Sequence, residues 1–169
     1  MPITFHTADI KFSLRNRTAL KKFLHHQISA SSNQHINVSF IFCSDEYLLA
    51  INKQFLNHDS YTDIITFPLV QTKEKLQAEI YISVDRVKEN SLKFKVQSLQ
   101  PNPKSAIRNS QFEMELHRVI FHGMLHLLGY KDKTEANKLI MRKMEDKWIN
   151  QFSIYSSKDI AAKEKKQRK

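Results

Sequence analysis

Glycine is almost absent from this chain, and its two occurrences lie in the most constrained segment of the sequence. Among 169 residues there are 2 glycines, Gly123 and Gly129, both in the run from His122 to Asp132. Because glycine adopts the left-handed backbone conformation most easily, the chain has few places for a sharp reversal. Gly129 follows an apolar helical pattern, so we expect it to end a helix and turn the chain back.

Two histidines precede that turn. His122 and His126 are four residues apart, so on a helix they lie one turn apart on the same face and can bind one metal ion. The turn at Gly129 would bring Asp132 to the same ion as a third ligand. Two imidazoles and a carboxylate with a free fourth position are typical of catalytic zinc, so we predict one Zn²⁺ per chain at these three residues. The ligand types also admit nickel, cobalt or iron.

The alternative is that the two histidines are packed core residues, since a bare His-x-x-x-His pair is weak evidence of a site. The surrounding helix is apolar almost all round, and a buried imidazole needs a partner for each nitrogen. Gly123 lies inside this helix, where it costs about 1 kcal/mol relative to alanine, so we expect the sheet or a substrate to approach closely there. Glu115, two turns before His122, either orients a ligand or is solvated.

The residue after the first histidine is Gly123, whereas zinc peptidases of the His-Glu-x-x-His type carry their general base there. A metallopeptidase is therefore the least favoured hydrolase. A hydrolase built on this segment would take its base from elsewhere or use a water activated by the metal.

Charge and composition indicate a globular protein with a polyanionic partner. Lys and Arg number 27 against 17 Asp and Glu, a formal net charge of +10, and 41% of residues are hydrophobic. Such an excess favours RNA or DNA binding, although solvated lysines give the same count. No apolar stretch reaches the roughly 20 residues of a membrane span, and the first residues lack a signal-peptide pattern. We expect a cytoplasmic protein in which Cys43 is buried and forms no disulfide.

Hydrophobic periodicity predicts a single α+β domain, with a mixed sheet of about four strands covered by about five helices. Strands are expected at residues 3–10, 36–43, 64–69 and 78–84. Helices are expected at residues 18–29, 45–57, 85–94, 111–128 and 134–152. The two prolines at 101 and 103 predict a surface loop over 98–109. We expect the domain to span 1–155, followed by a basic tail at 156–169 that is disordered or a frayed helix.

The segment around the histidines is similar to a known family. The run from His122 to Tyr130 resembles the His-Gly-x-Leu-His-Leu-x-Gly-Tyr-Asp-His motif of YbeY, the bacterial rRNA maturation endoribonuclease family. Upstream, residues 52–55, Asp59 and 62–68 resemble that family's Asn-x-x-Tyr/Phe-Arg-x-x-Asp-x-x-Thr-Asp-Val-Leu-Ser-Phe-Pro pattern. The two motifs together are specific.

The resemblance extends over residues 16–148, and residues 78–80 stand where the family usually has Gly-Asp-Ile. It implies a zinc-dependent, single-strand-specific endoribonuclease that acts in 16S rRNA 3′-end maturation and ribosome quality control. The implied partners are 16S rRNA, the small ribosomal subunit and a ribosomal protein.

Two departures from the family pattern bear on the site. Asp132 stands where the family has its third histidine, and a carboxylate is a competent zinc ligand. Leu56 stands where the family has an arginine linked to RNA handling or catalysis. A fixed cation stabilises phosphoryl charge, so a replacement is expected from elsewhere in the chain. The candidates are Arg86, Lys53 and His58.

Three functions follow. In the leading hypothesis His122, His126 and Asp132 hold the ion, His122 and Asp63 are the catalytic candidates, and Asp63 with Thr62 shapes the rim of the cleft unless it is a structural cap. The second hypothesis is a non-catalytic rRNA- or ribosome-binding assembly factor with a structural metal, which the loss of the arginine favours. The third is the metallopeptidase.

Overall fold

Four strands form one mixed sheet in the order β1-β2-β4-β3. The computed structural model describes residues 2–31, 35–93 and 105–167 of the chain. β1 pairs with β2 and β2 with β4 in parallel, whereas β3 pairs with β4 antiparallel. The strands are β1 Ile3–Thr7, β2 His35–Cys43, β3 Ile64–Gln71 and β4 Lys75–Ser83.

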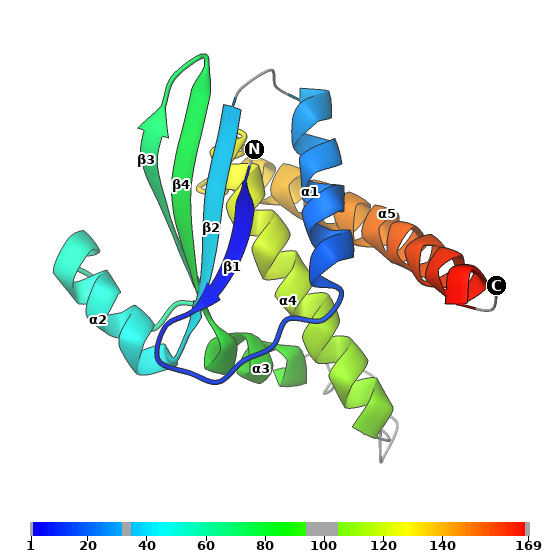
Figure 1. Cartoon of the computed structure of the whole chain (residues 1–169). Helices are drawn as coiled ribbons and strands as arrows, with labels where there is room; N and C mark the ends of the chain where they lie inside the picture. The colour runs from blue at the N-terminus through cyan, green and yellow to red at the C-terminus, as the bar shows by residue number, and fades with distance from the viewer. Residues whose placement is uncertain (1, 32–34, 94–104, 168–169) are drawn as a thin grey trace.

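Five helices in the described ranges cover this sheet. Figure 1 shows α1, α4 and α5 together on one side of the strands, with α2 apart from them on the other side. None of these helices carries an apolar stretch long enough to cross a membrane. The helices are α1 Arg17–Ser31, α2 Asp45–Leu56, α3 Val84–Lys93, α4 Ser105–Leu127 and α5 Glu135–Gln167.

Alternation along the central strands divides the sheet into two faces, because successive strand residues point to opposite sides. On β2, Val38 and Phe40 are buried in the main core with residues of α1, α4 and α5. Cys43 belongs instead to a smaller cluster with Leu48 of α2 and Ile65 of β3. The main core therefore lies between the sheet and α1, α4 and α5, and α2 packs on the other face.

The predicted fold class is confirmed, while several boundaries were wrong. The first strand ends at Thr7 instead of residue 10, and Asp9 leaves the sheet to accept a hydrogen bond from the backbone N–H of Ser44 (2.9 Å). α4 begins at Ser105, so the loop predicted over 98–109 is wrong for 105–109, and 98–104 lies outside the described residues. Prolines restrict themselves and the residue before them, and the residues that follow can be helical.

The last helix, α5, continues beyond residue 152, where its apolar pattern ends. Its backbone stays helical to Gln167, whereas the amphipathic pattern ends near residue 152, because a charged segment can extend a helix that packing has already started. The expected tail is thus helical over 156–167. The division into a domain at 1–155 and a tail at 156–169 stays a prediction.

At Gly123, α4 lies closely against the sheet. A Cβ atom built there would lie 2.8 Å from Cδ1 of Ile64 and 3.1 Å from Cγ2 of Ile80. Ile64 lies on β3 and Ile80 on β4, so the expected close approach of the sheet is confirmed. This contact places the face of α4 that carries His122 and His126 beside β3.

We expect Gly123→Val to lower the free energy of unfolding by about 1–3 kcal/mol, because the added methyl groups overpack the contact with Ile64 and Ile80. Chemical denaturation measures the change. Ala136→Val, at an exposed position of α5, is the matched control, since it introduces the same β-branched side chain into a helix without a tight neighbour. Equal effects of the two substitutions would show that helix propensity, and not the contact with the sheet, explains the glycine.

Candidate metal centre

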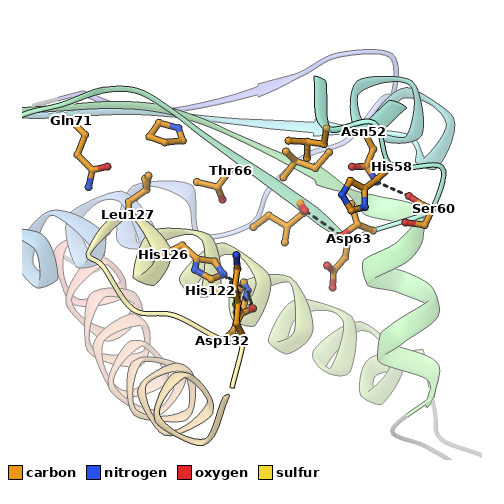
Figure 2. Close-up of a pocket in the computed structure, with 16 residues that line it drawn as sticks. Asn52, His58, Ser60, Asp63, Thr66, Gln71, His122, His126, Leu127 and Asp132 are labelled. Carbon is orange, nitrogen blue, oxygen red and sulfur yellow. Dashed lines mark hydrogen bonds and ion pairs between the residues drawn. The ribbon is translucent and has the colours of Figure 1, made fainter. Parts of the chain in front are cut away.

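The end of α4 brings the two predicted histidine ligands together. Nε2 of His122 and Nε2 of His126 are 2.9 Å apart, as expected for residues one helical turn apart. Figure 2 shows both rings on the α4 side of a pocket, next to Asp132. The pair therefore presents two ring nitrogens to one point in space.

The turn at Gly129 brings in the third residue. Gly129 has a φ of 93°, and its N–H donates to the carbonyl of His126 (3.0 Å) while Tyr130 N–H donates to that of Leu125 (3.0 Å). These two bonds form the Schellman motif that ends a helix with a left-handed glycine. After it, Oδ2 of Asp132 lies 3.6 Å from Nε2 of His122 and 3.5 Å from Nε2 of His126.

The other ring nitrogens determine which atoms face the centre. Nδ1 of His122 lies 2.8 Å from Oε1 of Glu145, and Nδ1 of His126 lies 3.0 Å from the backbone carbonyl of Tyr130. Both partners can only accept, so each Nδ1 carries the proton and donates. In the neutral rings both Nε2 atoms then present lone pairs to each other and to the carboxylate of Asp132.

Three acceptors that converge in this way require a cation, either a shared proton or a metal ion. The ligand atoms of His122, His126 and Asp132 all lie within 4.8 Å of one another, and the three residues are half-buried. Two imidazoles, each held by a further hydrogen bond, and a carboxylate match the donor set of divalent transition metals. This group could therefore hold a metal ion.

The burial of His122 and its charged neighbours shift its pKa in opposite directions. Burial by itself would lower the pKa of His122, but the hydrogen bond and negative charge of Glu145 raise that pKa above its ordinary value. Burial would raise the pKa of Glu145, yet its hydrogen bonds with His122 and Arg118 hold it below the ordinary value. Glu145 is thus an ionised carboxylate although its residue is only 5% exposed.

Glu145 is a site residue that was not predicted from the sequence. Glu115, predicted to orient a ligand or to be solvated, does neither: it is buried, its nearest ionic partner is Arg118 (3.8 Å), and burial raises its pKa. A signal for Glu145 was present, because it lies on the buried face of α5 that also carries Met141, Trp148 and Phe152. A carboxylate among apolar residues at helical spacing indicates a buried partner.

The triad opens into a pocket of about 890 Å³ between α4, β3 and the loop that joins α2 to β3. Asp63 lies in that loop and lines the pocket, as Figure 2 shows. Its backbone carbonyl also accepts from Ser83 N–H (2.9 Å) and its carboxylate from the amide of Asn90 (3.3 Å). Asp63 therefore combines contacts to β4 and α3 with a position facing the pocket, beside Thr62.

Of the three candidates for a replacement cation, one lines the pocket. Arg86 forms ion pairs with Asp45 (2.6 Å) and Glu89 (2.7 Å), and does not line the pocket. Lys53 is an exposed partner of Asp59 (2.8 Å). His58 does line the pocket, together with Leu56.

Lys133 is a further cation at this pocket, and the sequence analysis did not single it out. Its position follows from the same turn after Gly129 that places Asp132. A histidine and a lysine outside the triad therefore line the pocket on two sides, with His58 in the loop after α2 and Lys133 beside the triad.

Comparison with known proteins agrees with the geometry. The family model described as Endoribonuclease YbeY matches residues 2–153 of the chain. The chain belongs to the YbeY family. It is 42% identical over 144 residues to Endoribonuclease YbeY of Cytophaga hutchinsonii, an alignment that covers 85% of this chain and 91% of that protein. It is 44% identical over 125 residues to the Christiangramia forsetii protein of the same name, covering 73% and 77%.

A solved structure shares the fold. The solution structure of TM1509 from Thermotoga maritima superposes with a TM-score of 0.56 at 24% identity, over 89% of each chain. This likeness supports the arrangement of strands and helices and no more.

We expect the wild-type protein to bind about one equivalent of Zn²⁺, because three convergent ligands form one site. His122→Ala and Asp132→Ala should each lose most of it, while His58→Ala, which removes a pocket residue outside the triad, should keep it. Elemental mass spectrometry of gently purified protein measures the content. An absence of bound metal in the wild type after reconstitution with zinc, nickel or cobalt would mean that the histidines are packing residues.

Proposed function

We propose that this protein is a metal-dependent endoribonuclease that cuts single-stranded RNA, and that it acts in the cytoplasm on the 3′ end of 16S rRNA during maturation and quality control of the small ribosomal subunit. The observation that carries the proposal is the convergence of His122, His126 and Asp132 at a pocket in a chain of the YbeY family. The relatives' name, endoribonuclease, supports the activity.

A Zn²⁺ ion bound at the triad would supply Lewis acidity, polarising a phosphate oxygen or a water molecule. The protein residues have separate tasks. His122, His126 and Asp132 would hold the ion through Nε2 atoms and a carboxylate oxygen. We assign Asp63 the task of orienting the attacking water and accepting its proton, because its carboxylate faces the same pocket from the opposite loop.

RNA phosphates need positive charge at this pocket. The formal net charge of +10 attracts a polyanion to the protein as a whole. Within the pocket, we propose that His58 and Lys133 contact the phosphates on either side of the cleaved bond. His58 then replaces the family arginine whose position Leu56 occupies, while Arg86 is already neutralised by its two carboxylate partners.

A non-catalytic role is the second candidate, and one observation favours it: Leu56 lines the pocket where the family has a cation. In that case the metal is structural, and the basic surface binds rRNA or a ribosomal protein without cleavage. The two candidates differ in a single assay, since the assembly factor would bind single-stranded rRNA fragments tightly and leave them intact.

We expect metal-loaded protein to cleave single-stranded fragments from the 3′ end of 16S rRNA, and Asp63→Asn to reduce the rate roughly 100-fold, as for loss of a general base. His58→Ala should reduce it at least about 10-fold by removing a stabilising contact to the phosphate. Gel analysis of labelled RNA under single-turnover conditions measures both rates. Lys53→Ala, which removes an exposed lysine outside the pocket, is the control and should cleave normally.

Binding measured in parallel separates the candidates. If Asp63→Asn binds the fragments like the wild type but does not cut them, the enzyme is supported. If the wild type with full metal occupancy binds the fragments and leaves them intact, the assembly factor is correct and the endoribonuclease proposal is wrong.

A further inference from the structure

Glu145 divides its two carboxylate oxygens between different partners. Oε1 lies 2.8 Å from Nδ1 of His122. Oε2 lies 3.2 Å from Nη1 of Arg118 and 3.3 Å from Nη1 of Arg142. One oxygen is therefore fixed by two cations, and the other is left for the imidazole.

The two arginines stabilise the negative charge of Glu145 at this buried position. A buried carboxylate without partners is strongly destabilising, and cations with good geometry offset the loss of hydration. Arg118 is itself held by Asp146 (2.7 Å) and lies near Glu115 (3.8 Å). The guanidinium of Arg118, which comes from α4, thus ties Glu145 of α5 to the helix that carries the histidines.

Stability alone does not account for this network. Replacing a buried ion pair by apolar residues of similar volume is often neutral or stabilising, and the neighbouring residues on this face of α5, Met141 and Trp148, are buried and apolar. What an apolar residue could not do is accept a hydrogen bond from the His122 ring. The direction of Oε1 is the specific feature of the network.

The two histidines are oriented in different ways. His126 donates Nδ1–H to the carbonyl of Tyr130, which belongs to the turn that ends its own helix. His122 has no such local acceptor and depends on a side chain from α5, 23 residues along the sequence. The direction of one Nε2 atom is therefore set within α4, and that of the other by the packing of α5 against α4.

We propose that Glu145, clamped by Arg118 and Arg142, is the positioning residue of the metal centre. Its carboxylate fixes the tautomer and the rotation of the His122 ring, so that Nε2 faces His126 and Asp132. The affinity for the ion then depends on the docking of α5. This inference rests on the proposed metal centre and extends it to residues that touch neither ion nor RNA.

The test compares Glu145→Gln and Glu145→Leu with Glu115→Gln. Glutamine keeps the size of the side chain and an acceptor oxygen but loses the charge, and leucine loses the acceptor as well. Glu115 is the matched control, because it is a buried glutamate beside the same Arg118 whose recorded partner is that arginine and not a histidine. Arg142→Gln, at a half-exposed side chain, loosens the clamp without touching His122.

Two readouts are needed. The first is the affinity for Zn²⁺ and Co²⁺, measured by competition with a chelating dye and from the visible spectrum of Co²⁺. The second is the tautomer of His122 in metal-free protein, read from the ¹⁵N chemical shifts of its ring. Loss of an outer-shell partner typically weakens metal binding by about 10–100-fold.

We expect Glu145→Leu to weaken metal binding by an amount in that range and Glu145→Gln to weaken it about 10-fold. Arg142→Gln should weaken metal binding less than Glu145→Gln does, and Glu115→Gln should bind metal with wild-type affinity. The His122 ring should lose its fixed Nδ1–H tautomer in Glu145→Leu only. Wild-type affinity and tautomer in both Glu145 variants would overturn the proposal. If those variants fail to fold, a wild-type metal affinity in Arg142→Gln would overturn it equally.

Failure of the proposed function gives a different result. In that case the wild type binds neither Zn²⁺ nor Co²⁺, or binds one and cuts no RNA. The ring tautomer in metal-free protein still decides the role of Glu145: a change in Glu145→Leu supports positioning of His122, and an unchanged signal refutes it.

Discussion

The close packing of α4 on the sheet at Gly123 is the contact on which the rest of the structure depends. A side chain there would meet Ile64 of β3 and Ile80 of β4, so the absence of one lets the helix lie directly on the strands. His122 is the neighbour of that glycine, and the pocket forms where α4 passes β3. A helix held further away would still carry both histidines, but the opposite wall with Asp63 and His58 would lie further from them.

Charge around the centre is arranged in two layers. The half-buried group of His122, His126 and Asp132 faces the pocket, and behind it Glu145 is buried with Arg118. The inner carboxylate is ionised because cations surround it, and it imposes a donor role on Nδ1 of His122. Behind the pocket thus lies a carboxylate that solvent scarcely reaches, paired with Arg118 and with the half-exposed Arg142.

Membership of the YbeY family supports the fold, and the details of the pocket come from this chain's own residues. Asp132 is the third candidate ligand, and Leu56, His58 and Lys133 line the same pocket. Arg86, a candidate cation by residue type, is instead engaged with Asp45 and Glu89.

The amino-acid sequence by itself determined the local features: the α+β class from periodicity, the two histidines on one helical face from their spacing, and the reversal that carries Asp132 from Gly129. Such features depend on neighbouring residues, whose geometry the backbone fixes. It gave wrong ends for the first strand and for α4, and no role for Glu145. Only the tertiary structure decided that Glu145 and not Glu115 contacts His122, and that Arg86 is neutralised, because contacts between distant residues depend on how whole helices pack.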